Sequence, residues 1–132
     1  MSITVLVADD ADIMRRELRW LLSQLPTVRI VGEASDFSQL VQMARKFKPQ
    51  IIVMDLYLIP LGHPNAPREI KSCVDCCSQL LAVSFSNDPE SKALAKDIGA
   101  VRLLDKMNLY SELGPTISQL APSSTISDGP SQ

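Results

Sequence analysis

The chain has 132 residues, 45% of them hydrophobic, and its thirteen basic and fifteen acidic residues leave a formal net charge of −2. Such a size and composition are those of one globular domain with a core of its own. The sequence has no basic stripe typical of nucleic-acid binding, no apolar stretch as long as a membrane span and no N-terminal secretory signal. We therefore expect a cytoplasmic protein that by itself binds neither nucleic acid nor a membrane.

In the first part of the chain, short apolar runs alternate with stretches in which apolar residues recur at helical spacing. Apolar runs of this kind predict buried strands, and the helical spacing predicts amphipathic helices between them. Trp20 lies between leucines of the first such helix, so we expect it to pack in the core. The predicted elements are a strand at 3–8, a helix at 12–25, a strand at 28–34, a helix whose apolar face runs from Phe37 to Phe47 and a strand at 51–54.

The second part of the chain continues the alternation after an interruption rich in proline. Asp88-Pro89-Glu90 is a helix start, with a capping side chain, a proline at the first helical position and an acid near the positive end of the helix dipole. Pro115 falls inside the last helical pattern, so that helix should start late or kink. The predicted elements are a long loop from residue 57, a short helix at 67–77, a strand at 80–83, a helix from Asp88 to Gly99, a strand at 101–104 and a final helix opened by Asn108.

This order of elements predicts an α/β fold, a doubly wound five-stranded parallel sheet with helices on both faces. We expect that domain to occupy residues 1–121. Residues 122–132 are mostly Pro, Ser, Thr and Gly and predict a disordered tail or a linker.

Polar side chains stand where the predicted strands stop. Asp9 and Asp10 follow the first strand, Asp55 the third and Ser84 the fourth, and Lys106 comes soon after the fifth. In a parallel sheet the carboxyl ends of the strands open into one crevice, where ligands bind. Three carboxylates, a hydroxyl and an ammonium should therefore converge at one edge of the sheet.

That grouping suits a divalent cation and a phosphoryl group. Mg²⁺ prefers oxygen ligands and retains several waters, so we expect Asp10 and Asp55 as direct ligands, Asp9 holding a metal-bound water and the Tyr57 carbonyl completing the set. Asp55 is the candidate nucleophile, since a carboxylate can carry a phosphoryl group as an acyl phosphate. Lys106 and Ser84 would each bind a phosphoryl oxygen.

These residues and their surroundings resemble the receiver domain of response regulators in bacterial two-component signalling. The resemblance covers about residues 2–121, and it rests on VLVADDADIMRRELRWLL, RIVGEASDFSQLVQMARKFKPQIIVMDL, LLAVSFSND and GAVRLLDK. It is closest to receivers that precede a helix-turn-helix output domain. It implies the flavodoxin-like receiver fold and a phosphoryl group taken by Asp55 from a sensor histidine kinase or a phosphotransfer protein, with Mg²⁺ bound. The protein would not be an enzyme beyond assisting its own phosphoryl transfer and hydrolysis.

The resemblance also implies a switching face formed by the fourth helix, the fifth strand and the fifth helix, with a possible homodimer through it. Three features depart from the family pattern: a longer, Pro-rich segment after Asp55, the bulky Phe85 after Ser84, and Leu103 where an aromatic residue often reports activation. The resemblance also places Tyr57 and Ser86 at the two positions that, in the family, tune loss of the phosphoryl group. His63 lies in the Pro-rich segment, and we expect an ordinary loop histidine there.

Two functional hypotheses follow. The first is a phosphorylation-dependent receiver, in which every chemical residue has a role. The alternative is a receiver-fold interaction module that acts by protein contact alone, which the three departures would favour. A flavodoxin-like cofactor binder is a distant third, because the turn after the first strand lacks a phosphate-binding Gly-rich loop.

Overall fold

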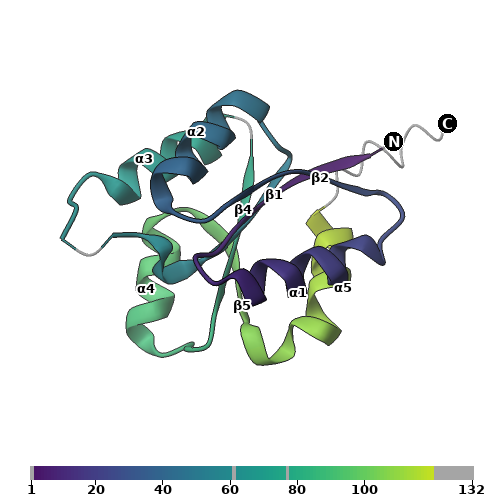
Figure 1. The fold of residues 1–132 in the computed structure, drawn as a ribbon. Helices are drawn as coiled ribbons and strands as arrows, with labels where there is room; N and C mark the ends of the chain where they lie inside the picture. The colour runs from purple at the N-terminus through teal and green to yellow at the C-terminus, as the bar shows by residue number, and fades with distance from the viewer. Residues whose placement is uncertain (1, 61, 77, 121–132) are drawn as a thin grey trace, which may run out of the picture.

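A parallel sheet of five strands in the order β2-β1-β3-β4-β5 forms the centre of the fold. The computed structural model describes residues 2–60, 62–76 and 78–120. Helices cover both faces of the sheet (Figure 1). The elements are β1 (Ile3–Ala8), α1 (Asp12–Ser23), β2 (Val28–Ala34), α2 (Phe37–Phe47), β3 (Ile51–Asp55), the 3₁₀ helix η1 (Leu56–Leu58), α3 (Ala66–Cys76), β4 (Gln79–Ser84), α4 (Pro89–Asp97), β5 (Ala100–Asp105), the 3₁₀ helix η2 (Lys106–Asn108) and α5 (Leu109–Leu120). The predicted fold class, a doubly wound five-stranded parallel sheet, is confirmed.

The strand order places the third strand beside the first and the fourth beyond it. β3 pairs with both β1 and β4, and all four pairings in the sheet are parallel. The three central strands are buried on both faces, which explains why their sequences are continuous apolar runs. The register places Ala8 opposite Met54 and Asp55 opposite Val83, so that the first, third and fourth strands end at the same level.

Alternate strand residues point to opposite faces and build two cores. Leu6 and Ala8 of β1 belong to the core under α2, α3 and α4, whereas Val5 and Val7 belong to the core under α1 and α5. This alternation is the two-residue period of an extended strand. Both cores are closed by the apolar faces of amphipathic helices, which leaves the strand ends as the open edge of the domain (Figure 1).

Aspartate side chains cap the starts of two helices, and the cap at Asp88 was predicted from the sequence. Asp36 accepts a hydrogen bond from the Gln39 backbone N–H at the start of α2, and Asp88 accepts one from Ser91 N–H at the start of α4. Pro89 occupies the start of α4, where its missing N–H costs nothing. These caps fix where the two helices begin.

The last helix begins where the sequence predicted. Residues 106–108 form η2, and the α-helix begins at Leu109, directly after Asn108. The helix does not start late, and Pro115 lies inside it. Leu109, Leu113 and Ile117 are buried against the sheet, and this burial keeps the helix continuous despite the missing N–H of the proline.

The prediction that Trp20 packs in the core is wrong. Its side chain is 51% exposed, and its ring stacks on Tyr110 of α5 with centroids 6.4 Å apart. Leu18 and Leu22 point inward, and Trp20 lies about 200° around the helix from each of them, on the outer side. Helical geometry, rather than its apolar neighbours in sequence, decides its position.

The C-terminal boundary of the predicted domain, at residue 121, is not tested by the structure. The predicted tail at 122–132 lies outside the described residues, as does Ala121. Within the described ranges, none of the helices is both long enough and apolar enough to span a bilayer.

Candidate functional site

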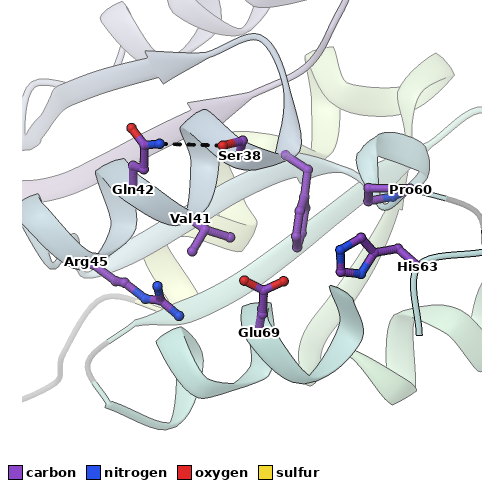
Figure 2. Close-up of a pocket in the computed structure, with 8 residues that line it drawn as sticks. Ser38, Val41, Gln42, Arg45, Pro60, His63 and Glu69 are labelled. Atoms are coloured by element: carbon purple, nitrogen blue, oxygen red, sulfur yellow. Dashed lines mark hydrogen bonds between the residues drawn. The ribbon is translucent and has the colours of Figure 1, made fainter. Parts of the chain in front are cut away.

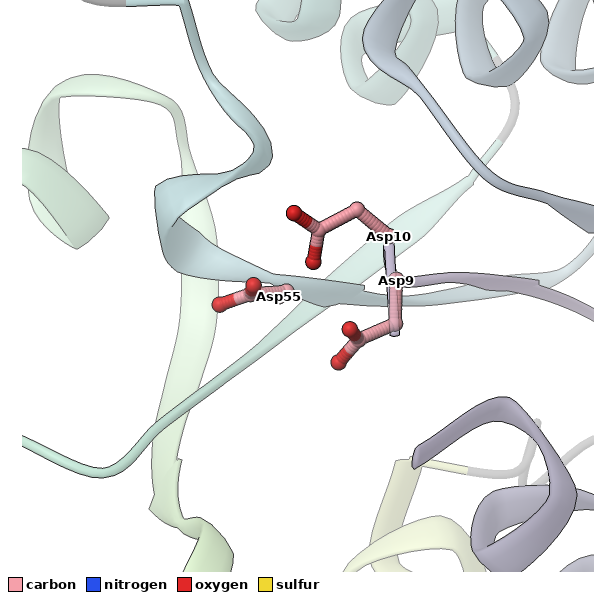
Figure 3. A group of neighbouring side chains, drawn as sticks. All are labelled: Asp9, Asp10 and Asp55. Carbon is pink, nitrogen blue, oxygen red and sulfur yellow. The ribbon is translucent and has the colours of Figure 1, made fainter. Parts of the chain in front are cut away.

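Three carboxylates meet where β1 and β3 end. Asp9 and Asp10 follow directly on β1, and Asp55 is the last residue of β3, its neighbour in the sheet. Each of the three offers an oxygen that lies within 4.8 Å of the others (Figure 3). The structure therefore brings together the three acids that the sequence placed at one sheet edge.

Lys106 reaches this cluster from the end of β5, at the same edge of the sheet. It follows β5, two strands away from β3, and its Nζ lies 2.8 Å from Asp9 Oδ2 and 3.6 Å from Asp55 Oδ1. The Lys106 side chain is only 5% exposed and that of Asp9 is not exposed at all. The ammonium is thus held between two carboxylates in a largely buried position, where charges interact strongly.

The two adjacent acids occupy different surroundings. Asp9 is fully buried and both of its carboxylate oxygens are engaged, one with Lys106 and the other as acceptor of the Ala11 backbone N–H at 2.9 Å. Asp10 is exposed at the mouth of the site. Asp10 therefore has the freer oxygens for an incoming cation, and Asp9 is better placed to orient other groups.

Asp55 combines partial burial with access to solvent. Its side chain is 15% exposed, and its Oδ1 accepts a hydrogen bond of 3.2 Å from Tyr57 N–H. Burial raises the pKa of Asp55 above its ordinary value of 3.8, and the nearby carboxylates of Asp9 and Asp10 add to that rise. Lys106 and the Tyr57 N–H act in the opposite direction and do not cancel it.

This raised pKa predicts that Asp55→Asn stabilises the protein without Mg²⁺ at neutral pH. Because the pKa is higher in the folded than in the unfolded chain, losing the proton opposes folding as the pH rises through the folded value. Below the ordinary pKa of 3.8 the carboxyl is protonated in both states and the penalty is absent. Urea unfolding of both proteins in chelator should therefore show a gap at pH 7 that closes near pH 3. A variant less stable than wild type at pH 7 would contradict this.

Ser84 ends β4 beside the cluster. It is nearly fully buried, it pairs in the β4–β5 register with Asp105, and its Oγ accepts a 3.0 Å hydrogen bond from Ser86 N–H. Its neighbour Phe85 is 63% exposed, with Lys106 Nζ 5.1 Å from the centre of its ring. This cation–π contact was not foreseen from the sequence, because nothing in the local pattern pairs residues 85 and 106.

Arg15 was also missed. Its guanidinium donates to the backbone carbonyl of Asp9 at 2.6 Å and pairs with Asp12 one turn back on α1. The N-cap position of α1 is Ala11, which makes no side-chain hydrogen bond. The i, i+3 spacing of Asp12 and Arg15 was the available signal. Arg15 thus fixes the turn that carries Asp9 and Asp10.

The cluster carries more negative than positive charge, which favours binding of a cation. Three carboxylates face a single ammonium, and the guanidinium of Arg15 is committed to a backbone carbonyl and to Asp12. Carboxylate oxygens are ligands that Mg²⁺ prefers, and one or two of them suffice for a site that keeps its waters. The donor set therefore fits a divalent cation held by Asp10 and Asp55.

A hollow of about 410 Å³ lies between α2 and α3, away from this cluster. Its wall includes Phe37 and Val41 of α2 and His63 and Pro60 of the loop before α3, and Arg45 and Glu69 face each other across it (Figure 2). None of the three clustered aspartates lines it. His63 is exposed at its edge, and the hollow is a separate feature of the surface.

Comparison with known proteins gives a consistent picture. The family model of the response regulator receiver domain matches residues 5–117. A protein-glutamate methylesterase/protein-glutamine glutaminase of Myxococcus xanthus is 36% identical over 110 residues, which are 81% of this chain and 30% of that protein. A protein-glutamate methylesterase/protein-glutamine glutaminase of Shewanella frigidimarina is 39% identical over 107 residues, which are 80% of this chain and 27% of that protein. The chain thus spans less than a third of the length of these curated relatives.

Solved structures agree with the observed architecture. The response regulator domain of Thermotoga maritima CheB superposes with a TM-score of 0.70 at 25% identity, over 90% of this chain and 92% of that one. The isolated receiver domain of RcsB from Salmonella enterica, solved with the phosphomimetic BeF₃⁻, gives 0.77 at 20% identity, over 91% and 88% of the two chains. The second likeness concerns the fold alone.

Proposed function

The chain belongs to the response regulator receiver domain family, and from that premise we propose that Asp55 is its phosphoacceptor and Mg²⁺ its cofactor. One observation carries the choice of Asp55. Of the three clustered carboxylates, it alone both lies near the Lys106 ammonium and retains solvent access, since Asp9 is fully buried and Asp10 makes no ion pair with Lys106. A nucleophile must be accessible to the phosphoryl donor, and a positive group must lie nearby to neutralise the negative charge of the transition state.

In the proposed reaction an Asp55 oxygen attacks the phosphorus of a phosphohistidine on a sensor kinase or a phosphotransfer protein. An O–P bond forms as the N–P bond breaks, and the imidazole leaves with its electron pair. Lys106, 3.6 Å from Asp55 Oδ1, is placed to neutralise charge on a phosphoryl oxygen. The buried Ser84 hydroxyl would donate its O–H to another phosphoryl oxygen while its Oγ still accepts from Ser86 N–H.

Mg²⁺ would supply most of the remaining charge neutralisation when it is bound. We assign Asp10 and Asp55 as its carboxylate ligands, the Tyr57 carbonyl as a further ligand and Asp9 as the residue that orients a metal-bound water. The engaged oxygens of Asp9 and the free oxygens of Asp10 support this division.

We further propose that the output of this receiver is a change in protein contacts at the face of α4, β5 and α5. Val101 of β5 is an exposed large side chain on one of those elements, and Met107 of η2, which joins β5 to α5, is another. A second copy of the chain is one partner that such a face could take. The methylesterase and glutaminase activities in the names of the relatives are not assigned here, because this chain matches only the smaller part of those proteins.

The test is phosphorylation of the purified protein. We expect incubation with acetyl phosphate and Mg²⁺ to add the mass of one phosphoryl group to the wild-type chain. Asp55→Asn should gain nothing, because an amide cannot form the acyl phosphate. Asp75→Asn, which changes an exposed acid on α3, should behave as wild type.

If the wild-type chain gains no phosphoryl group and calorimetry detects no Mg²⁺ binding, the phosphoacceptor proposal is wrong. The alternative, an interaction module independent of phosphorylation, would then account better for the exposed Phe85 and the long segment after Asp55.

A further inference from the structure

A continuous series of hydrogen bonds leads from Ser84 through the start of α4 and back to Asp55. Ser84 Oγ accepts from Ser86 N–H, and Ser86 Oγ accepts from Asp88 N–H at 3.4 Å. Asp88 in turn caps α4 by accepting from Ser91 N–H at 2.8 Å. The hydroxyls of Ser91 and Tyr57 then bond each other at 2.5 Å, and Tyr57 N–H donates to Asp55 Oδ1.

The link between Tyr57 and Ser91 is the long-range step in this series. The two residues are 34 positions apart, and their bond joins η1, which directly follows Asp55, to the first turn of α4. Ser91 is fully buried, whereas Tyr57 is about half exposed. The Ser91 hydroxyl also hydrogen-bonds the Asp88 side chain that caps α4, so Tyr57 is tied to the cap of this helix as well.

Tyr57 is tied to the site through its backbone as well. Its N–H donates to the proposed phosphoacceptor, and its carbonyl belongs to the residue that we assign as a further metal ligand. Holding the side chain against α4 therefore restricts where both backbone groups can lie. By contrast, Leu103 of β5 has no polar side-chain atom with which to join such a series.

We propose that Tyr57 and Ser91 are positioning residues of the phosphoryl site, which act through their hydroxyl–hydroxyl bond and couple that site to the start of α4. This role rests on the proposed function of Asp55. It specifies which residues position the phosphoryl site and which helix responds when that site is occupied. Because the coupling is a free energy, it works in both directions. Whatever binds at Asp55 must change the stability of the first turn of α4, and whatever holds α4 must change affinity at Asp55.

The test is a double-mutant cycle on ligand affinity. Mg²⁺ with BeF₃⁻, a mimic of the phosphoryl group, is titrated by calorimetry into wild type, Tyr57→Phe, Ser91→Ala and the double variant. We expect each single variant to bind about three- to tenfold more weakly, as for the loss of one hydrogen bond. The double variant should bind no more weakly than the weaker single one. Ser91→Thr, which keeps a hydroxyl, should bind close to wild type.

Stability in urea without ligand gives a second, independent readout. Tyr57→Phe loses the bond to the Ser91 hydroxyl, so its unfolding equilibrium constant should rise about three- to tenfold over wild type. Ser91→Ala loses that bond and also the hydrogen bond of its hydroxyl to the Asp88 side chain, so its constant should rise at least as far. The double variant should be no less stable than Ser91→Ala. Tyr110→Phe, which keeps the exposed stacked ring on α5, is the matched control and should change neither quantity.

The possible failures are distinguishable. If the wild type does not bind Mg²⁺ with BeF₃⁻, the proposed function fails and this inference with it. If the wild type binds and the two single variants bind within twofold of it, or their effects add, the phosphoacceptor proposal stands and the positioning role of Tyr57 and Ser91 is wrong. Lower stability with unchanged affinity would likewise overturn the inference, because it would show a purely structural bond.

Discussion

Replacing Lys106 with methionine should destabilise the protein by about 3–5 kcal/mol in the absence of Mg²⁺. Methionine keeps much of the length of the side chain and removes its charge. Asp9, which is fully buried, would then retain the Ala11 N–H and lose the ammonium 2.8 Å from its other oxygen. A buried carboxylate without a counter-charge is among the most costly defects in a folded protein. Urea unfolding in the presence of a chelator measures the loss.

Two further variants identify its cause. Adding Asp9→Asn to Lys106→Met removes the uncompensated charge, so the double variant should regain much of the lost stability. Lys92→Met changes an exposed lysine of α4 and should lie within about 0.5 kcal/mol of wild type. A Lys106→Met protein as stable as wild type would mean that Asp9 and Lys106 do not form the buried pair described here.

The convergence of Asp9, Asp55 and Lys106 could be predicted because it depends on topology alone. Continuous apolar runs identified strands buried on both faces, and alternation with helices required them to be parallel. Parallel strands must end at one edge, so residues that follow strands meet there whatever their separation in sequence. That reasoning needs no knowledge of side-chain conformation, and it therefore placed the acids and the lysine correctly.

Contacts that depend on side-chain direction could not be reached in this way. Tyr57 bonds Ser91, and Phe85 lies beside Lys106, across separations that have no period in the sequence. Both contacts follow from loop conformations after strands, where backbone direction changes from residue to residue. Trp20 is a different case, because the helical period of α1 places it on the outer side, opposite Leu18 and Leu22.

The last helix shows a different limit. Pro115 in its middle argued for a late start or a kink, whereas the helix begins directly after Asn108. Burial of Leu109, Leu113 and Ile117 outweighs those local preferences, since packing of an apolar face supplies most of a helix's stability in a protein. The cap at Asp88 was a reliable local signal, whereas Pro115 was not, because tertiary packing decides the course of the last helix.

Mg²⁺ should raise the melting temperature of this protein, and Asp10→Asn should remove that effect. A ligand at a hundred times its dissociation constant stabilises the folded state by about 2.7 kcal/mol, which for a chain of this size is about 10 °C. Asp10 is the exposed carboxylate of the cluster, and its oxygens have no counter-charge among the ion pairs of the described residues. Thermal scans with MgCl₂ and with NaCl at equal ionic strength separate binding from general screening.

Without Mg²⁺, Asp10→Asn should raise the melting temperature above that of wild type rather than lower it. Three carboxylates with oxygens within 4.8 Å of one another repel, and Asp10→Asn relieves part of that repulsion, so the variant should melt higher than wild type in chelator. Asp97→Asn removes an equal charge from an exposed position at the end of α4 and should keep the full Mg²⁺ response. A variant at Asp10 that still gained about 10 °C from Mg²⁺ would place the cation elsewhere. The reversal of sign between chelator and Mg²⁺ is the outcome that only a metal ligand within an acidic cluster produces.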